Sequence, residues 1–151
     1  MPWPVVDDKT IMKYVCLCDP AVDRAKMSEE DVAAYERHPT PDSLPLVEGR
    51  TPERFRVHAL LPEVVDRLQA SMLAAVGPEP SKDAKDYDER VTARTLASVK
   101  AARQHDLDTV AEGVVDAPPM DTLRRTPQAY VEELAGVVRS LSTGDSVLLG
   151  N

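Results

Sequence analysis

The clearest pattern of hydrophobic and polar positions lies in the middle of the chain, where a short alternating segment precedes a helical one. Phe55, Val57 and Ala59 alternate with more polar neighbours, and a period of two is typical of a half-buried strand. We therefore predict a strand over Arg54–Leu60. Within it, His58 falls on the more polar face, where an ordinary exposed histidine is expected rather than a catalytic base.

The segment after this strand has the spacing of an amphipathic helix. Pro62 suits the first turn, where its missing amide hydrogen removes no hydrogen bond. Apolar side chains then recur every four residues, and two more widen the stripe: Val64, Leu68, Met72 and Val76, with Val65 and Leu73 beside them. Gly77 is a residue type that commonly ends helices. We predict a helix over Pro62–Val76.

Two elements are predicted before this middle segment. The run from Ile11 to Cys18 is rich in strand-preferring residues and ends at a turn signal, Asp19-Pro20. This second short strand is a candidate to pair with the first. Ser28, followed by acidic residues, has the signature of an N-cap, so a short helix should run to about Arg37.

Three segments follow the middle helix. A looser apolar face predicts a long, polar helix over Ser81–Gln104 that partly projects from the rest. Leu107–Val115 is compatible with a short strand or with irregular structure. Thr126-Pro127 opens a last helix, whose apolar stripe reaches Leu141 and which should end at Gly144.

These elements predict one small α+β domain dominated by helices, with extended arms at both ends. The predicted organisation is an N-terminal arm at 1–10, a domain at 11–142 with Pro-rich loops at 38–53, 77–82 and 113–126, and a C-terminal tail at 143–151. A chain of 151 residues has room for one core. Thirteen prolines against six glycines make many connections stiff, and only 4% of the residues are aromatic. Valine, leucine and alanine must therefore fill the core.

Charge and hydropathy exclude several classes of partner. The net charge of −8 disfavours nucleic-acid binding, because phosphate contact needs a clustered basic surface. The two groups of arginines are interpreted as solvated faces: Arg50, Arg54 and Arg56, and Arg90, Arg94 and Arg103. No apolar run approaches the ~20 residues that cross a bilayer, and the first residues lack the order of a signal peptide. We expect a soluble protein, made in the cytoplasm, that binds no membrane.

The cysteines, Cys16 and Cys18, lie two residues apart. On a strand both thiols would share one face about 7 Å apart, which suits neither a tight disulfide nor a complete metal site. Zinc sites use about four ligands, and the three histidines are scattered. We interpret the pair as small buried side chains. A disulfide between chains is the alternative for Cys16 and Cys18, and no metal or other cofactor is expected.

Several apolar side chains outside the predicted elements are candidates for contact with partner proteins. Trp3 stands in the Pro-rich arm, where it either folds back on the core or anchors in a partner's pocket. The others lie in the first loop and in the tail, where either the domain or another chain must cover them: Leu44, Leu46, Val47, Val147, Leu148 and Leu149. No catalytic motif of a hydrolase, metalloprotease, nucleotide-binding or dinucleotide-binding enzyme is present. We therefore expect no enzymatic activity.

Three stretches of sequence carry a resemblance to a known group of proteins. These are DPAVDR after the first strand, LVEGRTPERFRVHALLP leading into the middle helix, and PQAYVEELAGVVRSLS before the apolar tail. In order and spacing across most of the chain, the pattern resembles small proteins from the morphogenesis modules of tailed bacteriophages. The resemblance implies a virion component or an assembly factor that acts on capsid or tail proteins, and it carries no catalytic residues.

Three functional hypotheses follow. The favoured one is a structural virion protein, assembled in the host cytoplasm in multiple copies, that binds capsid, portal or tail subunits through its arms and loops. The alternatives are a tail-assembly chaperone that is absent from the mature particle and a small cytoplasmic regulator unrelated to phage. Particle composition separates the first two, and DNA binding would identify the third.

Overall fold

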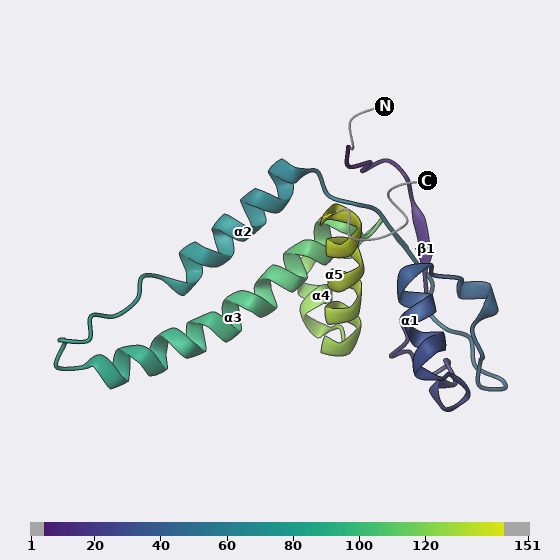
Figure 1. Ribbon diagram of the computed structural model, residues 1–151, viewed down its shortest axis with the longest axis horizontal. Coiled ribbons are helices and arrows are strands. Elements are labelled where there is room, and N and C mark those ends of the chain that lie inside the picture. The colour runs from purple at the N-terminus through teal and green to yellow at the C-terminus, as the bar shows by residue number, and fades with distance from the viewer. Residues whose placement is uncertain (1–4, 144–151) are drawn as a thin grey trace.

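The computed structural model describes residues 5–143 and has the helix-dominated α+β architecture predicted from the sequence (Figure 1). In chain order the elements are β1 (Met12–Tyr14), the 3-10 turn η1 (Arg24–Lys26), α1 (Glu29–Arg37), the 3-10 turn η2 (Pro41–Ser43), β2 (Phe55–Val57), α2 (Pro62–Val76), α3 (Tyr87–Gly113), α4 (Met120–Arg125) and α5 (Gln128–Thr143). The structure therefore divides into a compact base and a long helical hairpin made of α2 and α3.

The two strands pair, as the sequence suggested, in an antiparallel ribbon with Lys13 opposite Arg56. Both strands are shorter than predicted. After β1 the chain turns, and the Asp19 amide donates to the Cys16 carbonyl at 3.1 Å. After β2 the next amide, that of His58, donates to the Gly113 carbonyl at 2.9 Å. The backbone groups beyond each strand thus bond to a turn and to the end of α3 instead of extending the ribbon.

Helix α1 begins at a capping box. The Ser28 hydroxyl accepts from the Asp31 amide at 3.1 Å, and the Asp31 carboxylate accepts from the Ser28 amide at 2.9 Å. This reciprocal pair satisfies two amides that the first helical turn leaves open. The single buried side chain of α1, Tyr35, binds the backbone of Val15 in both directions: its hydroxyl donates to the carbonyl at 2.6 Å and accepts from the amide at 3.1 Å. Tyr35 thereby fastens α1 to the segment after β1.

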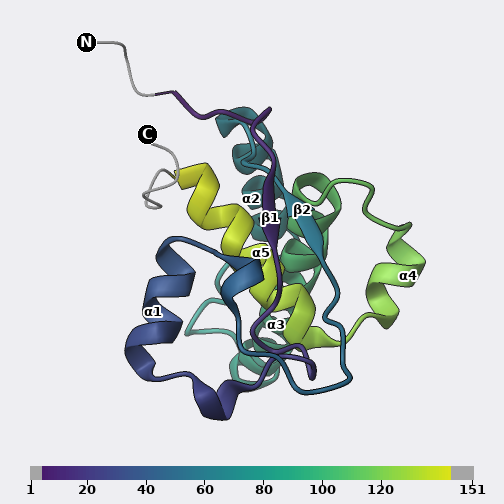
Figure 2. The same cartoon turned by 90° about the vertical axis from the view of Figure 1, so that its right-hand side faces the viewer.

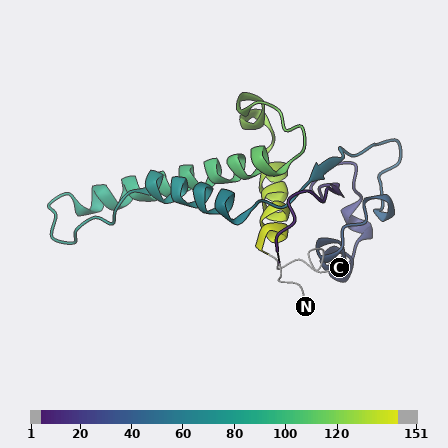
Figure 3. The same cartoon turned by 90° about the horizontal axis from the view of Figure 1, so that it is seen from above.

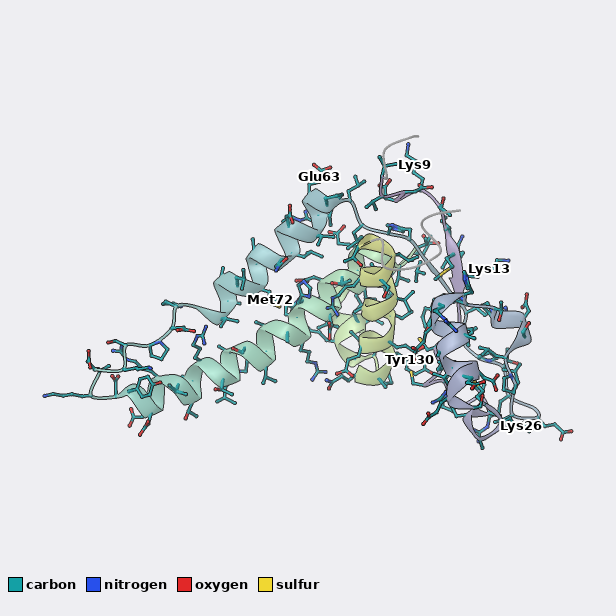
Figure 4. All side chains as sticks on the ribbon, in the orientation of Figure 1. Lys9, Lys13, Lys26, Glu63, Met72 and Tyr130 are labelled. Atoms are coloured by element: carbon teal, nitrogen blue, oxygen red, sulfur yellow. The ribbon has the colours of Figure 1, made fainter. Side chains whose placement is uncertain are left out.

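Helix α5 runs through the centre of the base, behind the ribbon in the view of Figure 2. This helix contributes more buried residues than any other described helix. The core joins α5 to the ribbon, to α1 and to the second half of α3, and its buried members are Tyr14, Val15, Cys16, Leu17, Val22, Tyr35, Leu44, Val57, Ala59, Leu60, Leu68, Leu107, Val110, Val114, Leu123, Val131, Leu134, Ala135, Val138 and Leu141. Near the start of α5, the ring of Tyr130, which is labelled in Figure 4, meets the Phe55 ring of β2 edge to face, with the ring centroids 6.3 Å apart.

The α2–α3 hairpin extends far beyond this core, as the view from above shows (Figure 3). Gly77 ends α2 with a φ of 79°, a conformation that glycine adopts without strain. Only Leu68 of α2 is buried, and the buried residues of α3 all lie at or after Ala101. The outer half of the hairpin therefore contributes nothing to the core.

The observed bounds of α3 differ from the helix predicted after the linker. It starts later than predicted, at Tyr87, and continues to Gly113 through a segment interpreted as a strand or irregular. Leu107 and Val110, three residues apart, lie on one helical face and are both buried. Only Val114, beyond the helix, makes a strand-like bridge, to Val57. Packing against α5 thus extends the helix where the local pattern was ambiguous.

The predicted loops also contain short helical elements. Helix α4 lies within the predicted loop 113–126, directly after Pro119, and the 3-10 turn η2 lies within the predicted loop 38–53. A proline at the start of a helix removes no needed donor, and burial of Leu123 fastens α4 to the core. Residues 5–10, the described part of the predicted N-terminal arm, form neither helix nor strand.

Candidate functional site

The first candidate site is the turn that follows β1. The carboxylate of Glu133, a residue of α5, accepts hydrogen bonds from this turn. The Oε2 atom of Glu133 accepts from the Tyr14 hydroxyl at 2.7 Å and from the Leu17 amide at 2.6 Å. Its Oε1 atom accepts from the Cys18 amide at 3.0 Å. These bonds join residues more than a hundred positions apart and fix both the carboxylate and the turn.

The same turn brings the two thiols close together. The sulfur atoms of Cys16 and Cys18 and a carboxylate oxygen of Glu133 all lie within 4.8 Å of one another. The sequence analysis placed these thiols about 7 Å apart on a strand, and that prediction was wrong because β1 ends at Tyr14. Cys16 is fully buried and Cys18 is exposed, so only Cys18 is accessible for the predicted disulfide between chains.

The nearby Glu133 carboxylate also affects the ionisation of both thiols. Burial, followed by the nearby Glu133 charge, raises the pKa of Cys18 to about 11 and raises the pKa of Cys16 further. Both thiols therefore stay protonated at neutral pH, and neither is an activated nucleophile.

A second group of polar side chains joins α3 to α5. The Arg139 guanidinium lies 2.9 Å from the His105 Nδ1 and forms an ion pair with Asp106. Partial burial first, and then the Arg139 charge, lower the pKa of His105. The lowered pKa favours the neutral form of the His105 ring beside the Arg139 cation. This arrangement positions two helices and contains no nucleophile.

The other histidine of interest, His58, was expected to be exposed. It is half-buried, and its Nδ1 lies 2.8 Å from the Ala59 carbonyl. The reason is that the segment after β2 lies against the end of α3 and does not continue as a strand with one solvated face.

A surface depression of about 750 Å³ lies beside α1 and η2, with Lys26, Asp31 and His38 among its lining residues. Its charges are mixed, and it contains no catalytic constellation.

The apolar candidates from the first Pro-rich loop separate into two groups. Leu44 is buried in the core of the protein itself, so the domain covers it and it is not available to a partner. Leu46 is 40% exposed although its backbone bridges to Val22, and Val47 is half-buried. The remaining predicted partner-binding residues, Trp3, Val147, Leu148 and Leu149, lie outside the described residues.

The largest exposed apolar side chains of the described helices lie on the α2–α3 hairpin. The sequence predicted that Leu73 belongs to the apolar stripe of the middle helix and that the long helix after it partly projects. Leu73 is 61% exposed, Leu96 is 60% exposed and Val99 is 64% exposed, with Val91 at 37%. Met72, by contrast, is half-buried on α2 (Figure 4). Apolar spacing predicted helices correctly here but could not reveal that no layer covers their outer side. We call the exposed set of Leu73, Val91, Leu96 and Val99 the hairpin surface.

Glu133 is the functional candidate that sequence reasoning missed. It was not considered because metal-ligand patterns were sought among cysteines and histidines, and Glu133 is far from both cysteines in the chain. Its neighbour Glu132 is exposed and bonds only to Gln128, on its own helix. One signal in the sequence could have identified Glu133. It is a carboxylate on the apolar side of a helix, next to Leu134, which is buried.

Among the described residues, no helix is both long and apolar enough to span a membrane. Two features of the described residues are candidates for binding: the cluster of Cys16, Cys18 and Glu133, and the hairpin surface. Compared with protein-family models, with curated proteins and with solved structures, the chain matches none of them.

Proposed function

We propose that this chain is a non-enzymatic structural component of a tailed-bacteriophage particle, assembled in multiple copies in the host cytoplasm and retained in the virion. The phage assignment rests on the resemblance in sequence pattern. The observation that carries the structural role is the hairpin surface, with Leu73, Leu96 and Val99 each at least 60% exposed. Leu96 and Val99, three residues apart, share one face of α3, and large apolar side chains exposed on a projecting element are typical of protein–protein contacts.

The occupant proposed for this surface is a second copy of the chain. Along the outer side of α3, spacings of three and four residues alternate through Glu89, Thr92, Leu96, Val99 and Arg103. This is the spacing of a helix that packs on another helix. Among the described contacts, neither Glu89 nor Arg103 forms an ion pair within its own chain. The stripe is therefore apolar in its middle and carries opposite charges at its ends.

This distribution of charge favours an antiparallel pair. If two α3 helices cross at Leu96, Glu89 of one copy lies opposite Arg103 of the other, and Thr92 lies opposite Val99. A parallel pair would place Glu89 against Glu89 and Arg103 against Arg103, and like charges disfavour that alternative. The antiparallel arrangement has two-fold symmetry, in which one patch pairs with itself. Other virion subunits, from capsid, portal or tail, would then meet the base, where Leu46 is exposed.

The composition of purified particles tests the structural role. Phage particles from a host that expresses the chain are purified, and their proteins are quantified by mass spectrometry. We expect the chain at several copies per particle. Its absence from mature particles, with presence in assembly intermediates, would identify the tail-assembly chaperone instead. Specific DNA binding without association with particles would support the cytoplasmic regulator.

Charge reversal tests the proposed pairing of hairpins. Sedimentation equilibrium should show a dimer that weakens in Glu89→Arg and in Arg103→Glu, because each variant opposes like charges. The double variant should restore association, since it exchanges the two charges. Lys13→Glu, a reversal of an exposed charge on β1, serves as the control and should leave the dimer unchanged. Equal association in all four variants would refute the antiparallel register.

A further inference from the structure

We propose that Cys16, Cys18 and Glu133 form a binding site for one zinc ion. This inference goes beyond the structural role and does not depend on it. The three donor atoms already lie within 4.8 Å of one another. Two Zn–S bonds of about 2.3 Å at the tetrahedral angle place the sulfur atoms about 3.8 Å apart, so closure requires a movement of at most about 1 Å.

The Glu133 carboxylate has one lone pair left with which to bind a metal ion. Its Oε2 atom accepts two hydrogen bonds, from the Tyr14 hydroxyl and the Leu17 amide, which occupies both lone pairs. Its Oε1 atom accepts from one amide, that of Cys18. The second lone pair of Oε1 remains for the Cys18 thiol hydrogen or for a metal ion that replaces it.

The positions of the ligand atoms indicate where the metal ion would bind, because the two sulfur atoms and the Glu133 oxygen lie within 4.8 Å of one another. Each of the two thiols carries one hydrogen. Zinc binding replaces both, because the ligand is the thiolate. Two protons pass to solvent, no electron is transferred, and the ion with two thiolates and one carboxylate carries a net charge of −1. No oxidant or co-reactant is needed.

The surroundings of Glu133 already resemble the outer shell of a metal site. Hydrogen bonds from Tyr14 and from two backbone amides fix the orientation of the carboxylate, as such contacts do around bound metals. Burial of Cys16 shields one side of the cluster, and exposure of Cys18 leaves a route from solvent. Two soft sulfur donors and one oxygen favour zinc over calcium or magnesium, which take oxygen ligands. Water would supply the fourth ligand.

Zinc titration of the full, reduced chain tests this site. With a chromophoric chelator as competitor, the wild type should bind one zinc ion per chain. Cys18→Ser and Glu133→Gln should each bind at least about tenfold more weakly, since each removes a charged ligand. His38→Ala is the control, because it removes an exposed histidine away from the cluster, and it should bind as the wild type does.

Two measurements keep the result decisive if a variant folds poorly. Cobalt(II) bound to the wild type should show the intense charge-transfer absorption of thiolate ligands. Zinc should also slow the alkylation of Cys18 in the wild type. Wild-type binding no tighter than that of Cys18→Ser, or cobalt without thiolate absorption, would overturn the proposal. A Cys16–Cys18 disulfide that persists in excess reductant would overturn it as well, because the ligands would then be consumed.

Discussion

The base of the molecule and the outer half of the hairpin are built from the same kinds of residues, yet they differ in what holds them. One helix, α3, crosses both regions. Its residues from Ala101 onward include five that are buried, whereas none of those from Tyr87 to Lys100 is buried. Leucine occurs in both halves, buried at Leu107 and 60% exposed at Leu96. Burial therefore depends on the layer opposite the helix and not on the helix itself.

The difference also extends to polar contacts. In the base, side chains distant in sequence bond to one another, as Glu133 does with Tyr14 and the turn after it. At the outer part of the hairpin, the polar contacts are local, such as Arg90 with Asp86 and the Thr95 hydroxyl with the Val91 carbonyl. Local contacts between exposed groups contribute little to stability, because solvent screens the charges. Among the described contacts, those of the outer hairpin are therefore weaker than the long-range bonds of the base.

The largest expected effect compares the same substitution in the two regions. Leu134→Ala leaves a cavity in the core beside α5 and should lower the free energy of unfolding by about 2–5 kcal/mol. Leu96→Ala removes an exposed side chain and should change it by less than about 0.5 kcal/mol. Urea unfolding, at protein concentrations where the chain is monomeric, measures both. A large loss in Leu96→Ala under these conditions would show that the outer hairpin has its own core.

The next effect concerns the long-range bonds of the base. Glu133→Ala removes the acceptor of the Leu17 and Cys18 amides and of the Tyr14 hydroxyl. Leaving buried donors without an acceptor should destabilise the metal-free protein by roughly 1–3 kcal/mol. Glu132→Ala is the control on the same helix and should have little effect, since Glu132 bonds only to Gln128. Thermal unfolding with a chelator present measures the pair, and equal melting temperatures would contradict the role given to Glu133.

A third comparison uses two glycines on packed and unpacked faces. A Cβ atom at Gly113 would lie 2.4 Å from the Val138 Cγ1, whereas one at Gly136 would meet nothing within 4 Å. Gly113→Ala should therefore destabilise the protein by about 1–3 kcal/mol through overpacking. Gly136→Ala should stabilise it by about 0.5–1 kcal/mol, because alanine is the better helix former. Denaturant midpoints decide the signs, and a stabilising Gly113→Ala would show that α3 and α5 are not in close contact.

The fold was predictable where the local sequence pattern and the packing against other elements favour the same secondary structure. The alternation around Val57 and the four-residue spacing of Leu68 located β2 and α2, and the Ser28 cap located α1. The prediction failed where the local pattern was ambiguous and a distant element decided the structure. Residues 107–113 are helical where α3 packs against α5, whereas Val114 bridges to Val57, and α4 forms within a Pro-rich segment because Leu123 is buried.

The candidate sites were less predictable than the fold. The sequence identified Cys16 and Cys18 but could not place Glu133 beside them, because its distance in the chain conceals the contact. It placed Leu73 in the stripe of the middle helix and predicted that the long helix carrying Leu96 and Val99 projects in part, but it could not show that all three side chains are at least 60% exposed. Spacing identifies a helical face, but whether that face is covered depends on the arrangement of the whole chain and of its partners.

The smallest expected effect is a pH dependence at the junction of the two regions, where His105 contacts Arg139. Burial and the Arg139 charge lower the folded-state pKa of His105, while Asp106 and Asp108 oppose the shift. Below the ordinary value of 6.5, the unfolded chain therefore binds more protons than the folded one. Stability is fully present above that pH and falls as the pH drops toward the folded-state pKa.

The variant His105→Gln isolates this contribution, because it removes the titrating group and keeps a polar side chain. As the pH is lowered from neutral, the unfolding free energy of the wild type should fall relative to that of the variant. A wild type that gains stability relative to His105→Gln on acidification would mean that the carboxylates of Asp106 and Asp108 outweigh Arg139. The junction would then tighten in acid, and the hairpin would be held to the base most firmly at low pH.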